Sequence, residues 1–423
     1  MSALFITAVV LFVVAYALII SEKVHRTVVA LAGAILMILF GVLNQEQALE
    51  GVDFNTLGLL IGMMVIVGIA RHSGMFQYMA IWTSKVGKGK PVPIFVLLAL
   101  LTAVLSALLD NVTTVMLIVP VVFVVANNLR LNPKPFLIGA ILLSNIGGSA
   151  TLIGDPPNIL IGSAAGLSFN DFLIHMAPIS FIVTLVTIAM LYWWYRKDLV
   201  MQPGTQESIM AFRPEEAITD KPLLWKSLFT IGLVLIGFFT HGVTHLEGAT
   251  IALAGAALLL ILTMHEPEEY LREVEWTTIF FFSGLFVLVT GLEHVGAIRM
   301  LAEQLIAATG GNVKFLTIAL LWGSGIFSAV VDNIPFVATM IPLIKDIGAI
   351  SGIALGPLWW VLALGADIGG NATIVGASAN VVVSGMAGKE GHRIGFGEYM
   401  KVAIPMTVVG LLLCTVYVWM RYL

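Results

Sequence analysis

The sequence predicts an all-α polytopic membrane protein made of two inverted-topology repeats of five crossings, each with a re-entrant hairpin and a broken helix. Of its 423 residues, 59% are hydrophobic and only 11% are charged, whereas a soluble domain is roughly 25% charged. The apolar residues gather in stretches close to the length of a spanning helix, and the two halves of the chain match at one fixed offset. This composition excludes soluble enzymes, and a formal net charge of −4 offers no basic face for nucleic acid.

The first repeat is expected to span residues 1–195 and to cross the membrane five times. The apolar run after Met1 lacks a basic flank, so it is expected to be the first helix and not a cleaved signal. The stretches 93–109 and 115–128 meet at Asp110 and Asn111, which predicts a re-entrant hairpin that returns to its own side. The five expected crossings are 4–20, 27–43, 54–70, the broken stretch 136–165, and 173–195.

Residues 196–225 form the least apolar stretch and are expected to be a cytoplasmic linker between the repeats. The second repeat, 226–423, is expected to contain the same elements in the same order. Its apolar stretches are 226–240, 248–264, 276–292, 314–331, 334–348, 357–388 and 400–420.

A shift of 222 residues aligns rare polar residues of the two halves. The aligned segments are Ser106 to Asn111 with Ser328 to Asn333, Ile146 to Thr151 with Ile368 to Thr373, and Asn158 with Asn380. Because five is an odd number, the two repeats should have opposite orientations, and inverted repeats with broken helices are typical of secondary transporters. Placing the N-terminus outside puts most Lys and Arg on the cytoplasmic side, so we expect a multi-pass protein of the inner (cell) membrane.

The two hairpin tips are the first candidate site. Ionisable residues inside the hydrocarbon layer are costly and are read as functional by default. A tip inside the membrane also has backbone groups without helical partners, which Asp, Asn and Thr can satisfy while offering oxygens to a ligand. The alternative is that these side chains only cap the hairpin helices. The candidate residues are Asp110, Asn111 and Thr113 in the first tip, and Asp332 and Asn333 in the second.

The two broken crossings are the second candidate site. Gly147-Gly148 is expected to permit unwinding and Pro156-Pro157 to stop a helix, which leaves free backbone groups and a helix N-terminus facing the gap. The alternative is that the glycines pack against a neighbouring helix. The candidate residues are Asn145, Ser149, Thr151, Asp155 and Asn158 in the first half, and Asp367, Asn371, Thr373, Ser378 and Asn380 in the second.

The aligned positions differ in their acids, so the site is expected to be asymmetric. Asn145 aligns with Asp367, and Asp155 aligns with Ala377. Burial favours the neutral form of a carboxyl group, so these acids could pick up protons. No Lys or Arg lies beside them in sequence, which favours coupling to protons or cations over attraction of anions by fixed charge. The expected proton carriers are Asp110, Asp155, Asp332 and Asp367.

Together these motifs resemble the ArsB/NhaD branch of the ion transporter superfamily, which includes arsenite permeases, sodium/proton antiporters and the P protein. The resemblance covers nearly the whole chain and is carried by the Asp-Asn tips, by Gly154-Asp155-Pro156-Pro157-Asn158, and by Gly376-Ala377-Ser378-Ala379-Asn380. It implies a homodimer with scaffold and transport domains and elevator-type alternating access. It also implies that the tips and the broken helices line the site.

The expected function is export of arsenite or antimonite, as the neutral trihydroxide, in exchange for protons. Sodium/proton antiport is the alternative, and an anion or dicarboxylate carrier or an ion channel on the same fold stays open. The one cysteine, Cys414, cannot provide a thiolate cluster for a metal, and no cofactor or catalytic residue is expected. The chain lacks a phosphate-binding GxxxxGK[ST] element, so any ATP hydrolysis would need a separate cytoplasmic ATPase partner. Other expected partners are membrane lipid, protons and a small inorganic solute or Na⁺, with no nucleic acid.

Overall fold

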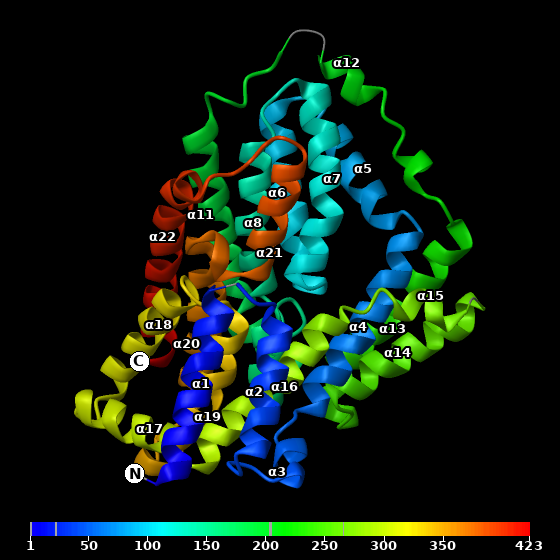
Figure 1. Ribbon diagram of the computed structural model, residues 1–423. Helices are drawn as coiled ribbons and strands as arrows, with labels where there is room; N and C mark the ends of the chain where they lie inside the picture. The colour runs from blue at the N-terminus through cyan, green and yellow to red at the C-terminus, as the bar shows by residue number, and fades with distance from the viewer. Residues whose placement is uncertain (1, 22, 203–204, 265) are drawn as a thin grey trace.

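The computed structural model describes residues 2–21, 23–202, 205–264 and 266–423, and the regular structure in these residues is helical (Figure 1). Within this described part, 9 helices are long and apolar enough to cross a membrane. This confirms the expected all-helical, polytopic membrane architecture.

The helices lie close to the stretches expected from the sequence. The first half contains α1 (Ala3–Ser21), α2 (Arg26–Leu39), α3 (Gln45–Glu50), α4 (Phe54–His72), α5 (Met75–Val86), α6 (Pro91–Leu108), α7 (Asn111–Leu129), α8 (Lys134–Gly148), α9 (Pro156–Ala165), α10 (Phe169–His175) and α11 (Ala177–Tyr195). The connecting segment contains α12 (Thr205–Met210) and η1 (Pro214–Ala217). The second half contains α13 (Lys221–Thr244), α14 (Gly248–Thr263), α15 (Pro267–Leu271), α16 (Trp276–His294), α17 (Ala297–Ala308), α18 (Val313–Ser328), α19 (Asn333–Ser351), α20 (Gly356–Gly369), η2 (Gly370–Ala372), η3 (Ile374–Gly376), α21 (Ser378–Lys389) and α22 (Phe396–Tyr422).

The shift of 222 residues relates helix bounds as well as sequence motifs. Applied to α4, α5 and α7, it gives the bounds of α16, α17 and α19. The glycines before α5 and α17 share one conformation, since Gly74 and Gly296 have φ of 78° and 76°. A left-handed backbone of this kind favours glycine, so the two halves turn into these helices in the same way.

Two expectations about the elements need correction. The short helices α5 and α17 were not among the expected stretches, because Gln, Lys, Arg and Glu interrupt their apolar runs. The linker is shorter than expected at its end, since α13 begins at Lys221. Residues 203–204 of the expected linker lie outside the described residues.

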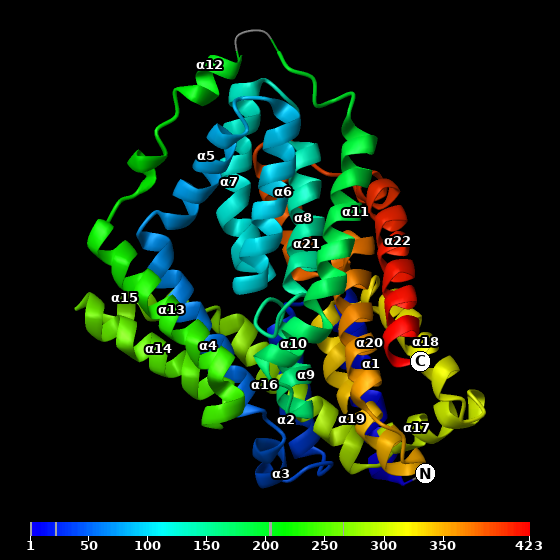
Figure 2. The same ribbon diagram turned by 180° about the vertical axis from the view of Figure 1, so that it is seen from behind.

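The connecting segment packs against the first half of the chain. The backbone N–H of Thr219 donates to the carbonyl oxygen of Ser73 at 3.1 Å, and the Thr219 hydroxyl donates to that of His72 at 2.6 Å. The side-chain amide of Gln206 donates to the carbonyl oxygen of Lys88 at 2.9 Å. From behind, the segment passes over the end of the molecule where α5 lies (Figure 2).

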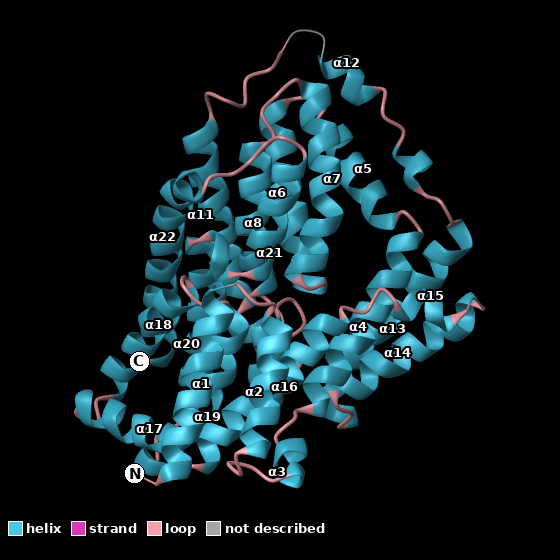
Figure 3. Cartoon of the chain, viewed as in Figure 1, coloured by secondary structure: helices cyan, strands magenta, loops and turns pink. Residues whose placement is uncertain are grey.

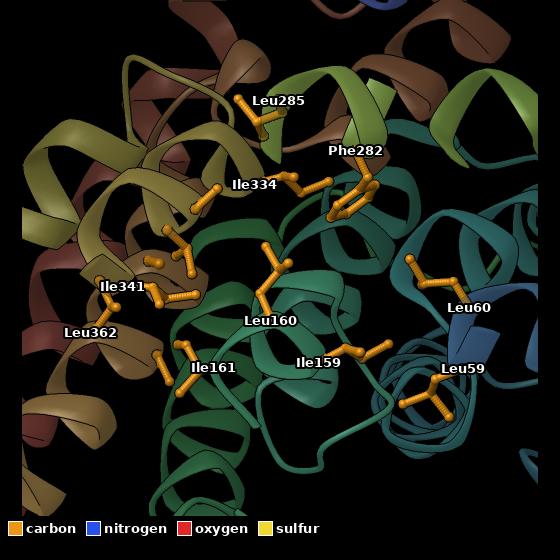
Figure 4. Close-up of a cluster of buried hydrophobic side chains, with 14 of the residues drawn as sticks. Leu59, Leu60, Ile159, Leu160, Ile161, Phe282, Leu285, Ile334, Ile341 and Leu362 are labelled. Carbon is orange, nitrogen blue, oxygen red and sulfur yellow. The ribbon is translucent and has the colours of Figure 1, made fainter. Parts of the chain in front are cut away.

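The two halves interleave through their short helices. Helix α9 contacts α19 and α20 of the second half, and α21 contacts α7 and α8 of the first. Ile159, Leu160 and Ile161 of α9 are buried among apolar side chains of α4, α16, α19 and α20 (Figure 4). Burying a branched apolar side chain stabilises a fold by about 1.5–3 kcal/mol, so this packing fixes the end of α9 that faces the break.

The glycines and prolines of the first broken crossing act differently from the expectation. Gly147 and Gly148 are helical, and a Cβ at Gly147 would overlap the backbone of Ala103 in α6. Pro156 and Pro157 do not stop a helix but begin α9, where proline is well suited because the first helical N–H groups have no partner. The break itself is residues 149–155 (Figure 3). The close-packing alternative is therefore correct for Gly147.

Candidate functional site

Both hairpin tips are helix N-caps. Asp110 precedes α7 and accepts the backbone N–H of Thr113 at 2.8 Å, and Asp332 precedes α19 and accepts that of Ile334 at 3.1 Å. Such caps satisfy N–H groups that the helix leaves without partners. The capping role is thus real at both tips, and any further role must come from the second carboxylate oxygen and the neighbouring Asn.

The breaks are attached to the hairpins by matching hydrogen bonds. Thr151 donates to the carbonyl oxygen of Ala107 at 2.5 Å, and Thr373 donates to that of Ala329 at 2.6 Å. The amide of Asn158 donates to the carbonyl oxygens of Gly148 and Thr151, and Asn380 donates in the same way to Gly370 and Thr373. These bonds satisfy buried backbone carbonyls of the unwound segments, so the four side chains shape the site.

Asp155 joins the two tips at the centre of the molecule. One of its carboxylate oxygens accepts the side-chain amide of Asn111 at 3.1 Å, and the other accepts that of Asn333 at 3.5 Å. Asp155 has 1% of its surface exposed, and both Asn residues are buried. A single carboxyl group on the first break therefore contacts both hairpins, which come from different halves of the chain.

A chain of amides continues from this carboxyl into the second break. Asn111 also donates to the side-chain oxygen of Asn145 at 3.2 Å, and Asn145 donates to those of Asn371 and Asn380 at 2.9 and 2.8 Å. The backbone carbonyl of Asn371 in turn accepts the hydroxyl of Tyr399 at 2.8 Å. The predicted residues of the two halves thus form one connected polar network.

Asp367 lies apart from this network. Its side chain is fully buried, and neither carboxyl oxygen has a hydrogen-bond partner counted with Asp as an acceptor; the same holds for the side-chain oxygen of Asn158. An ionised carboxylate without partners in an apolar interior is very costly. The arrangement therefore favours the neutral acid.

A small cavity lies between Asp155 and the tips. Its volume of about 20 Å³ is enough for roughly one water. Three carboxyl groups and one guanidinium contribute to its wall. The lining residues are Arg26, Met64, Asp110, Asn111, Val112, Asp155, Pro156, Glu275, Thr278, Asn333, Ile334 and Ser378.

Two of these charged residues are absent from the sequence-based candidates. Arg26 donates to Asp332 at 2.7 Å and to the hydroxyl of Ser378 at 2.8 Å. Glu275 accepts the hydroxyl of Thr278 at 3.0 Å, and burial raises its pKa, with the nearby Asp110 adding to the effect. The acids therefore do have a cation beside them, but it comes from a residue far away in sequence.

Two predicted residues take no part in the cavity. Ser149 donates to the carbonyl oxygen of Ile146 and pairs with the Ser180 hydroxyl at 2.8 Å, and it does not line the cavity. Thr113 contributes its backbone N–H to the Asp110 cap. Residue type and position near a break were therefore not sufficient to identify a lining residue.

Comparison with known proteins identifies the type of molecule. A family model described as a citrate transporter, CitMHS, matches residues 16–365. A 46 kDa membrane protein of Mycobacterium leprae is 43% identical over 99% of both chains, and an uncharacterized transporter of Mycobacterium tuberculosis is 42% identical over 99% of this chain and 98% of its own. The P protein of Homo sapiens is 34% identical over 95% of this chain and 58% of its own length.

A solved structure shares the fold. The YdaH transporter of Alcanivorax borkumensis has a TM-score of 0.61 over 100% of this chain and 99% of its own, at 16% identity. The P protein was one expected relative, whereas membership of the narrower ArsB/NhaD branch stays a prediction. With its apolar helices and its matches to these proteins, the chain is a multi-pass membrane transporter that belongs to the CitMHS citrate transporter family.

Proposed function

We propose that this protein is a proton-coupled secondary transporter that exchanges protons for a small solute where its two hairpin tips meet. The observation that carries the proposal is the position of Asp155, which contacts Asn111 of one tip and Asn333 of the other beside the central cavity. An ionised carboxyl is an acceptor only, whereas a protonated one has a donor in place of an acceptor site. Protonation of Asp155 would therefore weaken its bond to one of the tips and couple proton binding to tip movement.

The cavity size favours a small cargo. Room for roughly one water suits an ion, or a compact solute after modest widening. The first cargo that we propose is the neutral trihydroxide of As(III) or Sb(III), whose three hydroxyls match carboxyl and amide groups. Export would be driven by proton uptake.

The acids around the cavity support Na⁺ as a second cargo. Asp110, Asp155 and Glu275 outnumber Arg26 in the wall, and carboxylate and amide oxygens suit a hard cation. A citrate-like anion is supported by Arg26 and by the description of the family, but the three carboxyls would repel it. A channel mechanism is the remaining alternative, and it requires flux without coupling to protons.

We further propose that the halves, residues 1–195 and 226–423, are inverted repeats that work by elevator-type alternating access in a homodimer. The shared offset of helix bounds and hydrogen bonds supports the repeat, and the interleaving of α9 and α21 supports joint movement. The N-terminus would lie outside the inner membrane and the 196–225 linker in the cytoplasm. An ATPase partner, if used, would dock there.

A flux measurement on the purified protein in sealed vesicles tests the proposal. We expect an imposed pH gradient to drive As(III) or Na⁺ uptake and an internal pH dye to report the opposing proton flux. Citrate and Sb(III) complete the panel, and vesicles without protein are the control. Flux of Na⁺ alone would refute the arsenite cargo, citrate flux would reverse the charge preference, and equal flux with and without a pH gradient would indicate a channel.

A further inference from the structure

Arg26 occupies an unusual place for a cation. It is the first residue of α2, where the positive end of the helix dipole disfavours positive charge. Its side chain is 31% exposed, and its guanidinium lies 5.1 Å from the ring centre of Phe281. The position therefore needs an acidic partner to be stable.

That partner is Asp332 of the second hairpin tip. Arg26 Nη1 donates to Asp332 Oδ2 at 2.7 Å and to Ser378 Oγ at 2.8 Å, and Ser378 Oγ donates to the same Asp332 oxygen at 2.9 Å. The three side chains come from α2, the tip before α19, and the start of α21. They close a triangle that joins three separate elements.

The triangle separates two cavities. Arg26 and Ser378 line the central cavity, and both also line an outer cavity of about 320 Å³ together with Asp332. The rest of the outer wall is mostly apolar. Its other residues are Ile19, Ile20, Val24, His25, Val330, Val331, Val375, Val381 and Val382. A solute that moves between the outer and central cavities must pass the Arg26–Asp332 pair.

The first hairpin tip has no equivalent closure. The shift of 222 residues takes Arg26 to Gly248, Asp332 to Asp110, and Ser378 to Pro156. Neither Gly248 nor Pro156 has a side chain that can donate to a carboxylate. The closure is therefore a property of the second tip alone, and general packing of the repeat does not account for it.

We propose that Arg26 is a tethered cation that keeps the Asp332 tip closed, and that a cargo cation or a proton must replace it on Asp332 before the central cavity opens to the outer one. This rests on the proposed transport function and deepens it, because Arg26 then sets a preference for cations over anions. The titratable groups near the pair are Asp155, Glu275 and His25. Ser378 holds the carboxylate in place but carries no charge.

A cysteine accessibility experiment tests the closure without reference to the cargo. The only cysteine, Cys414, is fully buried, so Cys414→Ala gives a clean background for Met64→Cys in the wall of the central cavity. A membrane-impermeant maleimide is applied to vesicles from each side. We expect Arg26→Gln to raise the labelling rate at least tenfold from one side, and Arg26→Lys, which keeps the charge, to restore slow labelling.

Two further variants control for folding and for specificity. Arg26→Gln with Asp332→Asn removes both charges, so it avoids an unpaired carboxylate and should label as fast as the single variant. Arg71→Gln breaks the ion pair with Glu273, away from the cavities, and should leave labelling slow. Equal labelling with Arg, Gln and Lys at position 26 would overturn the proposal. Faster labelling without proton-coupled flux would retain the closure and refute the transport proposal.

Discussion

The two hairpin tips have the same backbone design and different side-chain partners. Each begins with an Asp N-cap followed by a buried Asn, and each is held to its break by a Thr hydroxyl. Only Asp332 is paired with an arginine, and the printed hydrogen bonds to the Asp110 side chain come from its own helix. The repeated part of the molecule is thus scaffold, and the unique residues carry the chemistry.

The tips also differ in how firmly they contact Asp155. Asn111 donates to it at 3.1 Å and to Asn145 as well, whereas Asn333 makes one long contact of 3.5 Å. The first tip is therefore fixed at the centre through amides. The second tip is fixed at its outer side through the Arg26 pair.

The largest expected effect comes from removing the charge that both tips share. Asp155→Asn keeps the shape but leaves one acceptor oxygen for two donors. Two hydrogen bonds to a charged group are worth about 3–6 kcal/mol, so we expect proton-coupled flux in vesicles to fall at least a hundredfold. Glu303→Gln, at an exposed ion pair with Arg299, is the control and should transport normally. Normal coupled flux in Asp155→Asn would exclude Asp155 as the coupling group.

Matched Asn variants test whether the tips are unequal. Asn111→Ala removes two hydrogen bonds and should lower flux about tenfold or more, whereas Asn333→Ala removes one weak bond and should lower it about threefold or less. Initial rates under one pH gradient measure both. Equal losses would mean that the two tips contribute equally.

The glycines before α5 and α17 provide a matched pair for stability. Both have positive φ, so Gly→Ala should cost about 1–2 kcal/mol at each. A Cβ at Gly74 would also overlap the carbonyl oxygen of Ala217, whereas a Cβ at Gly296 would meet open space. We expect Gly74→Ala to lower the melting temperature in detergent more than Gly296→Ala does. The reverse order would contradict the docking of the connecting segment beside Gly74.

The smallest effect should be the same in both halves. Thr151→Val and Thr373→Val each remove one hydroxyl that donates to a hairpin carbonyl at 2.5 or 2.6 Å. Each should cost about 1 kcal/mol of unfolding free energy. Denaturant titration of the two variants measures this, and a clear difference between them would show that the breaks are not equivalent.

Much of the fold follows from local sequence signals. Length and hydropathy identify the long helices, and the 222-residue shift of Asp110-Asn111 onto Asp332-Asn333 anticipates the matching bounds of α7 and α19. The breaks lie where polar residues interrupt apolar stretches. Gly147 was misread because a glycine that unwinds a helix and one that packs against a neighbour look alike in sequence.

The charged partners of the site were missed because they are distant in sequence. Arg26 is 306 positions from Asp332 and lies next to polar residues at the end of an apolar stretch, where a surface position is the simplest expectation. One signal was available: a cation at a helix N-terminus needs a compensating acid. Glu275 precedes Thr278 by the same spacing as Asp53 precedes Thr56, and both pairs are linked by a hydrogen bond.

The docking of the connecting segment has a consequence for how the molecule could be assembled. Residues after the first half reach back through Gln206 and Thr219 to carbonyls of Lys88, His72 and Ser73. A chain divided after Lys197 would leave these contacts on the second fragment, together with the packing of α21 on α7 and α8. Two co-expressed fragments would therefore carry their own instructions for reassociation, as a split protein does.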